Sequence, residues 1–161
     1  TLAAAVASEL GAPPGARVLR SDVIRKRLCE LEPEARLPEQ EYSAETTDRV
    51  YQALCGHAAA ALQAGYCAII DAVALRPDER QSFAAVARDA GVPFTGIWLE
   101  APPASLTTRV AARQNDASDA TAAVVERQLE IDPGRIDWHR VDAAKDQPEV
   151  VALVRQALRL H

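Results

Sequence analysis

Short apolar runs alternate with longer segments of helical periodicity along this chain of 161 residues. Apolar side chains that recur every three or four residues predict helices, and short continuous apolar runs predict buried strands. The expected strands cover residues 17–20, 66–71, 94–99 and 138–142. The expected helices cover residues 2–10, 21–28, 44–64, 77–90, 105–114, 119–129 and 148–160.

Residues that begin or end helices stand at the expected boundaries. Ser43 and Asp146 can each cap the helix that follows, because their side-chain oxygens accept a hydrogen bond from a free backbone N–H. Pro77 suits the first turn of a helix, and Gly65 and Gly91 are placed to end helices. These residues support the boundaries given by the apolar pattern.

Alternation of strands with helices predicts a single α/β domain. Such connections are right-handed crossovers that place the strands in a parallel sheet covered by helices on both faces. The continuous apolar run 66–71 indicates a fully buried parallel strand that ends in Asp71. A sheet of this kind is expected to contain a further central strand leading into the helix at Leu2. The chain contains no methionine, so we expect this strand to lie upstream of Thr1.

Composition narrows the class of protein. A content of 48% hydrophobic and 25% charged residues is ordinary for a soluble globular domain. The net charge of −5 argues against binding to nucleic acid or to an anionic membrane, and no apolar run is long enough to span a bilayer. Cys29, Cys55 and Cys67 have no paired spacing, so we expect free thiols and a cytoplasmic location rather than disulfides or a zinc site.

Ligands of open parallel sheets bind beyond the carboxyl ends of the strands, so residues directly after each expected strand are the first candidates for a site. Asp22 and Arg25 open the helix after the first strand and lie on one helical face. A carboxylate there can take a proton from a substrate hydroxyl while a guanidinium holds an anionic group. The alternative is that Asp22 caps the helix and Arg25 is a solvated surface residue.

Asp71 ends a buried strand, which is the general form of a Walker B element holding a carboxylate near hydrated magnesium. Asp71 could equally be a turn-forming residue before Ala72. Glu100 and the segment 142–145, which includes Lys145, follow the other two strands, and Lys145 is a further candidate for contact with a nucleotide.

Arg109 and Arg113 are four residues apart on an expected helix and precede a polar loop. Two guanidinium groups on one helical face suit the phosphates of a closing nucleotide site, although isolated arginines of this kind are more often surface residues. His57 and His139 lack a partner at catalytic spacing, so no nucleophile is assigned.

Several segments together resemble one family, the AAA-type P-loop kinase-like domains found at the C-terminus of bacterial proteins whose N-terminal half resembles aminoglycoside phosphotransferases. Wider relatives are polynucleotide kinases, chloramphenicol phosphotransferase, gluconate kinase and zeta toxins. The resemblance covers nearly the whole chain. The segments are Thr-Leu-Ala at the start, Val-Leu-Arg-Ser-Asp-Val-Ile-Arg-Lys-Arg-Leu at 18–28, Ile-Ile-Asp-Ala at 69–72, Trp-Leu-Glu-Ala at 98–101, and Arg-x-x-x-Arg with Asp-Ala-Ser-Asp-Ala at 109–120.

The resemblance implies a three-layer, adenylate-kinase-like P-loop fold that transfers phosphate from ATP with Mg²⁺ to a hydroxyl of a small molecule. It implies that Asp22 is the base, that Arg25 assists it and that Arg109 and Arg113 close over the nucleotide. The Walker A loop of the family is absent from the chain, and we expect it to end directly before Thr1, which then lies beside the nucleotide. A fused N-terminal phosphotransferase-like domain is a further expectation.

Two rival functions remain open at this stage. The first is a non-catalytic ATP-binding module that regulates a fused partner. The second is a Rossmann-type domain for a dinucleotide or a methyl donor, which would need a Gly-x-Gly-x-x-Gly turn before the first helix. The sequence upstream of Thr1 would separate both from a kinase.

Overall fold

A computed structural model describes residues 1–32, 35, 37–102 and 128–160 of the chain. The expected helices 105–114 and 119–129 lie almost wholly outside these ranges. Within them, the strands are β1 (Arg17–Arg20), β2 (Ala68–Asp71), β3 (Ile97–Glu100) and β4 (His139–Asp142). The helices are α1 (Leu2–Ala7), α2 (Ser21–Leu28), a short 3₁₀ helix η1 (Glu39–Tyr42), α3 (Ala44–Gln63), α4 (Pro77–Asp89) and α7 (Gln147–Leu158).

The strands form two parallel pairs. β1 pairs with β2 so that Arg20 lies opposite Asp71, and β3 pairs with β4 so that Glu100 lies opposite Asp142. Both pairs therefore end in charged residues at their carboxyl ends. No strand within the described ranges pairs with the remaining edge of any of the four.

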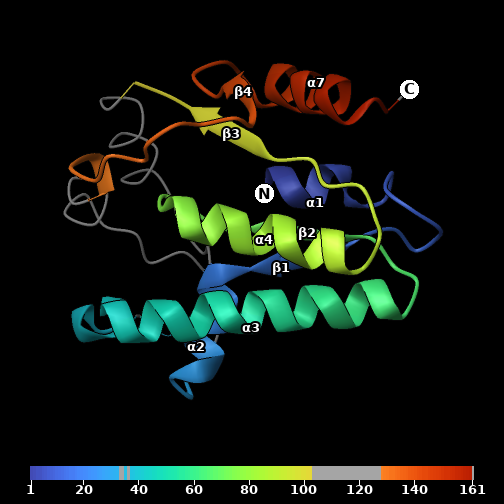
Figure 1. The fold of residues 1–161 in the computed structure, drawn as a ribbon. Coiled ribbons are helices and arrows are strands. Elements are labelled where there is room, and N and C mark those ends of the chain that lie inside the picture. Colours follow the sequence, from blue (N-terminus) through green and yellow to red (C-terminus); the bar gives the residue numbers. More distant parts are fainter. Residues whose placement is uncertain (33–34, 36, 103–127, 161) are drawn as a thin grey trace.

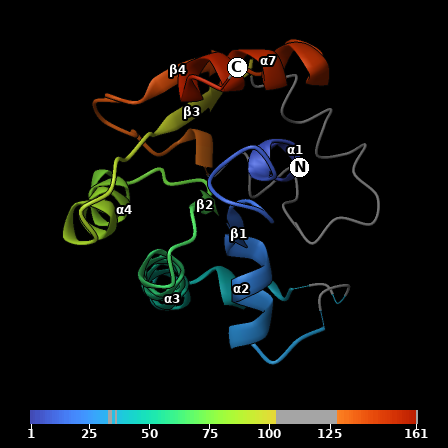
Figure 2. The same ribbon diagram turned by 90° about the vertical axis from the view of Figure 1, so that its right-hand side faces the viewer.

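Helices cover both faces of the strands, as the sequence predicts. α3 and α4 lie on one side of β1 and β2, and α1 lies on the other (Figures 1 and 2). α1 also contacts α7, which in turn packs on β4. A cluster of Val6, Val141, Val150 and Val154 fills this side, and Ile69 of β2 and Ile97 of β3 both pack against it. The two strand pairs thus share one layer of helices.

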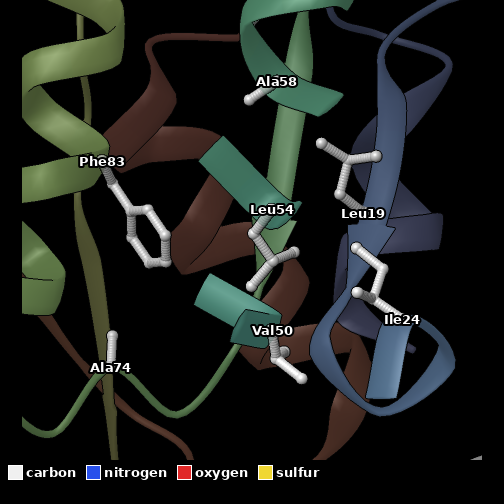
Figure 3. Close-up of a cluster of buried hydrophobic side chains, with 7 residues drawn as sticks. All are labelled: Leu19, Ile24, Val50, Leu54, Ala58, Ala74 and Phe83. Atoms are coloured by element: carbon white, nitrogen blue, oxygen red, sulfur yellow. The ribbon is translucent and has the colours of Figure 1, made fainter. Parts of the chain in front are cut away.

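A second apolar cluster lies between β1 and the helices α2, α3 and α4 (Figure 3). Val50 and Leu54 of α3 are completely buried at its centre, and the ring of Phe83 packs beside them. The rings of Tyr51 and Phe83 are stacked with 5.5 Å between their centroids. This cluster includes Leu19 of β1 and Ile24 of α2, and so fixes the orientation of α2 relative to the strand before it.

Capping residues, a proline and two glycines stand at helix ends as the sequence predicts. The Ser43 hydroxyl accepts a hydrogen bond from the N–H of Thr46, and the Asp146 carboxylate accepts one from Glu149. Pro77 stands in the first turn of α4. Gly65 and Gly91 adopt positive φ angles of 82° and 68° where α3 and α4 have ended.

Two expectations about the fold are wrong in detail. α1 ends at Ala7 and not at Leu10, although Leu2 and Leu10 both pack against the Val6 cluster. β2 is only partly buried at all four of its residues, where a fully buried strand was expected. The reason is that one edge of β2 has no neighbouring strand within the described part of the chain. Its side chains consequently keep some contact with solvent.

Candidate functional site

The carboxyl ends of β1 and β2 bring an arginine and an aspartate together. Arg20 and Asp71 are opposite one another in the parallel ladder, and their Nε and Oδ2 atoms are 3.6 Å apart. The Asp71 side chain is 39% exposed, so its carboxylate is accessible from solvent while paired. Arg20 was not singled out from the sequence, although it stands two residues before Asp22.

Asp22 lies in the first turn of α2, which begins directly after β1. The N-cap of this helix is Arg20, and no side chain provides a capping hydrogen bond. The interpretation of Asp22 as a helix cap is therefore wrong. Its carboxylate lies in the first turn of the helix, near the positive end of the helix dipole. Asp22 thus lies just beyond the carboxyl end of β1, and Asp71 is the last residue of the adjacent strand β2.

Thr1 lies at the start of α1 and caps it, because its hydroxyl accepts a hydrogen bond of 3.3 Å from the N–H of Ala4. Thr1 and Arg20 line the same cavity. Arg20 thus shares a cavity with Thr1, an ion pair with Asp71 and the N-terminal end of α2 with Asp22. What the Thr1 hydroxyl does beyond capping remains a prediction.

Arg25 is directed into the protein and not toward solvent. Only 6% of it is exposed, and its guanidinium donates a 2.9 Å hydrogen bond to the Glu41 carbonyl and longer ones of 3.4 Å to the Thr47 hydroxyl. It also lies 5.1 Å from the ring centre of Tyr42. The expected solvated arginine is therefore wrong. These contacts join α2 to η1 and α3, and so fix the helix that carries Asp22.

Lys145 lies in the turn after β4, as expected, but its ammonium is paired with the Glu149 carboxylate at 2.6 Å. This hydrogen bond raises the pKa of Lys145. Glu100, at the end of β3, pairs with Arg140 of β4. Lys145 therefore lies at the carboxyl end of the second strand pair, and its ammonium is engaged by Glu149. Arg109 and Arg113 lie outside the described residues, so their roles stay predictions.

The loop after β2 is held by Arg80, one of the positions beyond the end of this strand that the sequence marks as candidates. The buried guanidinium of Arg80 donates to the carbonyls of Ala74, Leu75 and Pro133 at 2.9, 2.6 and 2.5 Å. It also lies 5.6 Å from the ring centre of Trp98 in β3. Arg80 thus connects the loop after Asp71 with the other strand pair. Its place after the strand that ends in Asp71 could be read from the sequence, but its partners could not.

Tyr51 holds the same loop from α3. Its hydroxyl accepts a 2.9 Å hydrogen bond from the N–H of Ala74, which has a positive φ of 49°. Burial raises the pKa of the Tyr51 phenol, so it stays protonated. Glu79 accepts a hydrogen bond of 2.9 Å from the Arg76 N–H at the start of α4, and burial raises the pKa of its carboxyl. These contacts fix the backbone that follows Asp71.

The described strand ends offer few carboxylate ligands for Mg²⁺. No group of three or more His, Cys, Asp or Glu side chains within the described ranges could hold a metal ion. Mg²⁺ often binds through one or two carboxylates together with waters and substrate phosphates. The accessible carboxylate of Asp71 fits that mode, and the Arg20 guanidinium would compete with Mg²⁺ for this carboxylate.

Within the described ranges no helix is both long and apolar enough to cross a lipid bilayer.

Comparison with known families identifies the group to which this arrangement belongs. The sequence profile of the family AAA_33, described as an AAA domain, matches residues 1–131. The chain belongs to this AAA domain family. No curated protein sequence matches it significantly. Family membership and the parallel strands agree with the P-loop kinase-like α/β fold that the sequence predicts.

Solved structures agree on the fold of this AAA domain protein. An unliganded sugar kinase from Janibacter sp. HTCC2649 superposes with a TM-score of 0.64 at 16% identity, over 99% of this chain and 86% of that one. A gluconokinase from Sinorhizobium meliloti 1021 gives a TM-score of 0.61 at 18% identity, over 98% and 81% of the two chains. The tunicamycin resistance protein of Deinococcus radiodurans gives 0.56 at 19% identity, over 92% and 85%. At these identities the similarity concerns the fold.

Proposed function

We propose that the protein transfers the γ-phosphoryl group of ATP to a hydroxyl of a small-molecule acceptor, with Asp22 as the general base. The observation that carries the proposal is the position of Asp22 and Asp71 at the carboxyl ends of two adjacent parallel strands, beside Thr1 and Arg20. Ligands of such sheets bind at this end. Membership of the AAA domain family and the similarity to a sugar kinase and a gluconokinase support it.

Asp22 and Asp71 are suited to different tasks. Asp22 lies in the first turn of α2, where its carboxylate would accept the proton of an acceptor hydroxyl. Asp71 would hold Mg²⁺, which when bound neutralises charge on the transferred phosphoryl group. The Arg20 guanidinium would place positive charge beside the same phosphates. Arg25 would act by positioning α2, because its guanidinium is occupied by Glu41 and Thr47.

The strand arrangement supports a further part of the proposal, a strand and a Walker A loop directly before Thr1. β2 and β3 each have one unpaired edge within the described residues, and Ile69 and Ile97 of these strands pack against the same apolar cluster. A strand between them would join the two pairs into one parallel sheet and would lead into α1. The complete reading frame should then encode Gly-x-x-x-x-Gly-Lys-Ser immediately before Thr1. Any other residues there would remove this part of the proposal.

The proposed activity is tested by acceptor-dependent release of ADP. Protein expressed from the complete reading frame is incubated with Mg²⁺ and ATP against a panel of sugars, sugar acids and amino sugars. The proposal predicts that at least one class of hydroxyl compound accelerates ADP release and becomes phosphorylated, as detected by mass spectrometry. ATP binding without turnover on any acceptor would instead support the alternative of a regulatory nucleotide-binding module.

A further inference from the structure

A cavity of about 410 Å³ lies along the outer edge of β1, the edge that faces away from β2. All four residues of β1 line it, together with Thr1 and Ala4 of the α1 region and residues of α2 and α3. Its volume falls within the range of sites that hold small molecules, about 300–1,000 Å³. The cavity is thus large enough for a compact metabolite.

Three arginines and one histidine line this cavity, contributed by three elements. Arg17 and Arg20 come from β1, Arg27 from the last turn of α2 and His57 from α3. None of the described residues that line it is acidic. The protein as a whole carries a net charge of −5, whereas the charged side chains that line this cavity are all arginines. Charge complementarity therefore points to an anionic ligand.

The guanidinium groups of Arg17 and Arg27 are available to such a ligand. Neither has a hydrogen bond or an ion pair with a described residue, and both residues are exposed. Arg20, by contrast, is paired with Asp71. A guanidinium binds phosphate or carboxylate through two parallel hydrogen bonds, which gives both affinity and orientation. Two unengaged arginines from different elements favour a ligand that carries at least two anionic groups.

The backbone of β1 adds to the same surface. Arg17 donates its N–H to the Cys67 carbonyl at 2.8 Å, so it points toward β2. Backbone groups alternate in direction along a strand, and the N–H of Val18 therefore faces the outer edge and the cavity. Val18 and Val23 also line the cavity and add apolar surface beside the charged side chains.

We propose that this cavity binds a small anion carrying two or more phosphate or carboxylate groups, held by Arg17 and Arg27. Thr1 and Arg20 of the proposed transfer site also line this cavity, but Arg17 and Arg27, which carry the proposal, have no role assigned in the transfer. It places a ligand site on the flank of the sheet that adjoins the end carrying Asp71. Bound ligand would draw β1, α2 and α3 together.

The test uses calorimetric titration of inorganic pyrophosphate, without ATP or Mg²⁺, into the wild-type protein and three variants. Arg17→Gln and Arg27→Gln each keep a polar side chain of similar length but remove the charge. Arg88→Gln is the matched control, because Arg88 is an exposed arginine of α4 outside the cavity. Circular dichroism verifies that each variant is folded. Citrate is titrated in parallel to distinguish a phosphate ligand from a carboxylate one.

The expected result is saturable binding that weakens about tenfold in each of the two cavity variants and stays unchanged in Arg88→Gln. Tighter binding of pyrophosphate than of citrate would assign a phosphorylated ligand, and the reverse order a polycarboxylate. Absence of saturable binding for both anions would overturn the proposal. Binding that is equally strong in Arg17→Gln and Arg27→Gln, or equally weakened in Arg88→Gln, would also overturn it. If one variant fails to fold, the other still decides the result.

Discussion

The Arg20 guanidinium and the Asp71 carboxylate face one another across the ends of β1 and β2, with 3.6 Å between Nε and Oδ2. The parallel ladder fixes this relationship, because it places the last residue of one strand opposite the last residue of the other. It also places the start of α2, and with it Asp22, beside Asp71. The proposed transfer site is built on this pair.

Asp71→Asn tests the proposed magnesium role. If Asp71 holds Mg²⁺, the variant should need a higher Mg²⁺ concentration for half-maximal ATP turnover. The stability of the fold should change by no more than about 1 kcal/mol, because both partners of the ion pair are partly exposed. Turnover measured over a range of Mg²⁺ concentrations gives the shift. The matched control is Glu100→Gln, which removes the corresponding carboxylate at the end of β3. Equal Mg²⁺ dependence in wild type and Asp71→Asn would contradict the assignment.

Arg25→Gln tests whether the arginine supports α2 from inside the protein. The variant should lower the free energy of unfolding by about 1.5–3 kcal/mol, because a buried hydrogen bond from a charged donor to the Glu41 carbonyl is lost. Urea denaturation measures the change. Arg88→Gln, at a side chain that is 75% exposed, should leave the midpoint nearly unchanged. A midpoint for Arg25→Gln equal to that of wild type would show that the contacts with η1 and α3 contribute little.

The buried carboxyl of Glu79 predicts that the stability of the protein depends on pH. Burial raises the pKa of its carboxyl above the ordinary value of 4.5, so the folded protein holds the proton more tightly than the unfolded chain does. The stability that protonated Glu79 contributes is therefore present below the unfolded pKa and is lost as the pH rises through the raised folded pKa. Glu79→Gln cannot ionise, yet it can still accept the hydrogen bond from the Arg76 N–H.

The expected outcome is that wild type loses stability relative to Glu79→Gln as the pH is raised from about 4 to 7. Chemical denaturation of both proteins at several pH values within this window measures the difference. Other titrating groups affect the two proteins alike and cancel in the comparison. A stability difference that does not change with pH would contradict the raised pKa.

Local signals in the sequence were sufficient for most of the fold. Strand and helix periodicity located β1 and α2 at their exact residues, and the cap at Ser43 located the start of α3. The orientation of Arg25 could not be predicted in this way. Its partners Glu41 and Thr47 lie 16 and 22 residues further along the chain, and the Asp-x-x-Arg spacing contains no information about them.

Two further features, the position of Arg80 and the outer-edge cavity, depend on contacts between segments that are far apart in the sequence. Arg80 binds the carbonyl of Pro133, which is 53 residues away, and the outer-edge cavity combines side chains from β1, α2 and α3. The candidate positions Asp22 and Asp71 could be named because strand ends are readable from sequence. Their shared neighbour Arg20 became apparent only through the register of β1 with β2.

Asp22→Asn measures the central claim most directly. The substitution keeps the size of the side chain but removes its charge and its capacity to accept a proton. Transfer of labelled γ-phosphate from ATP to an active acceptor is compared between wild type, Asp22→Asn and Asp78→Asn, a control in the first turn of α4. A positioned general base contributes a factor of about 10²–10⁴, so Asp22→Asn should lose about that much of the rate while its ATP affinity and the activity of Asp78→Asn stay near wild type. A rate for Asp22→Asn close to that of wild type would contradict the account.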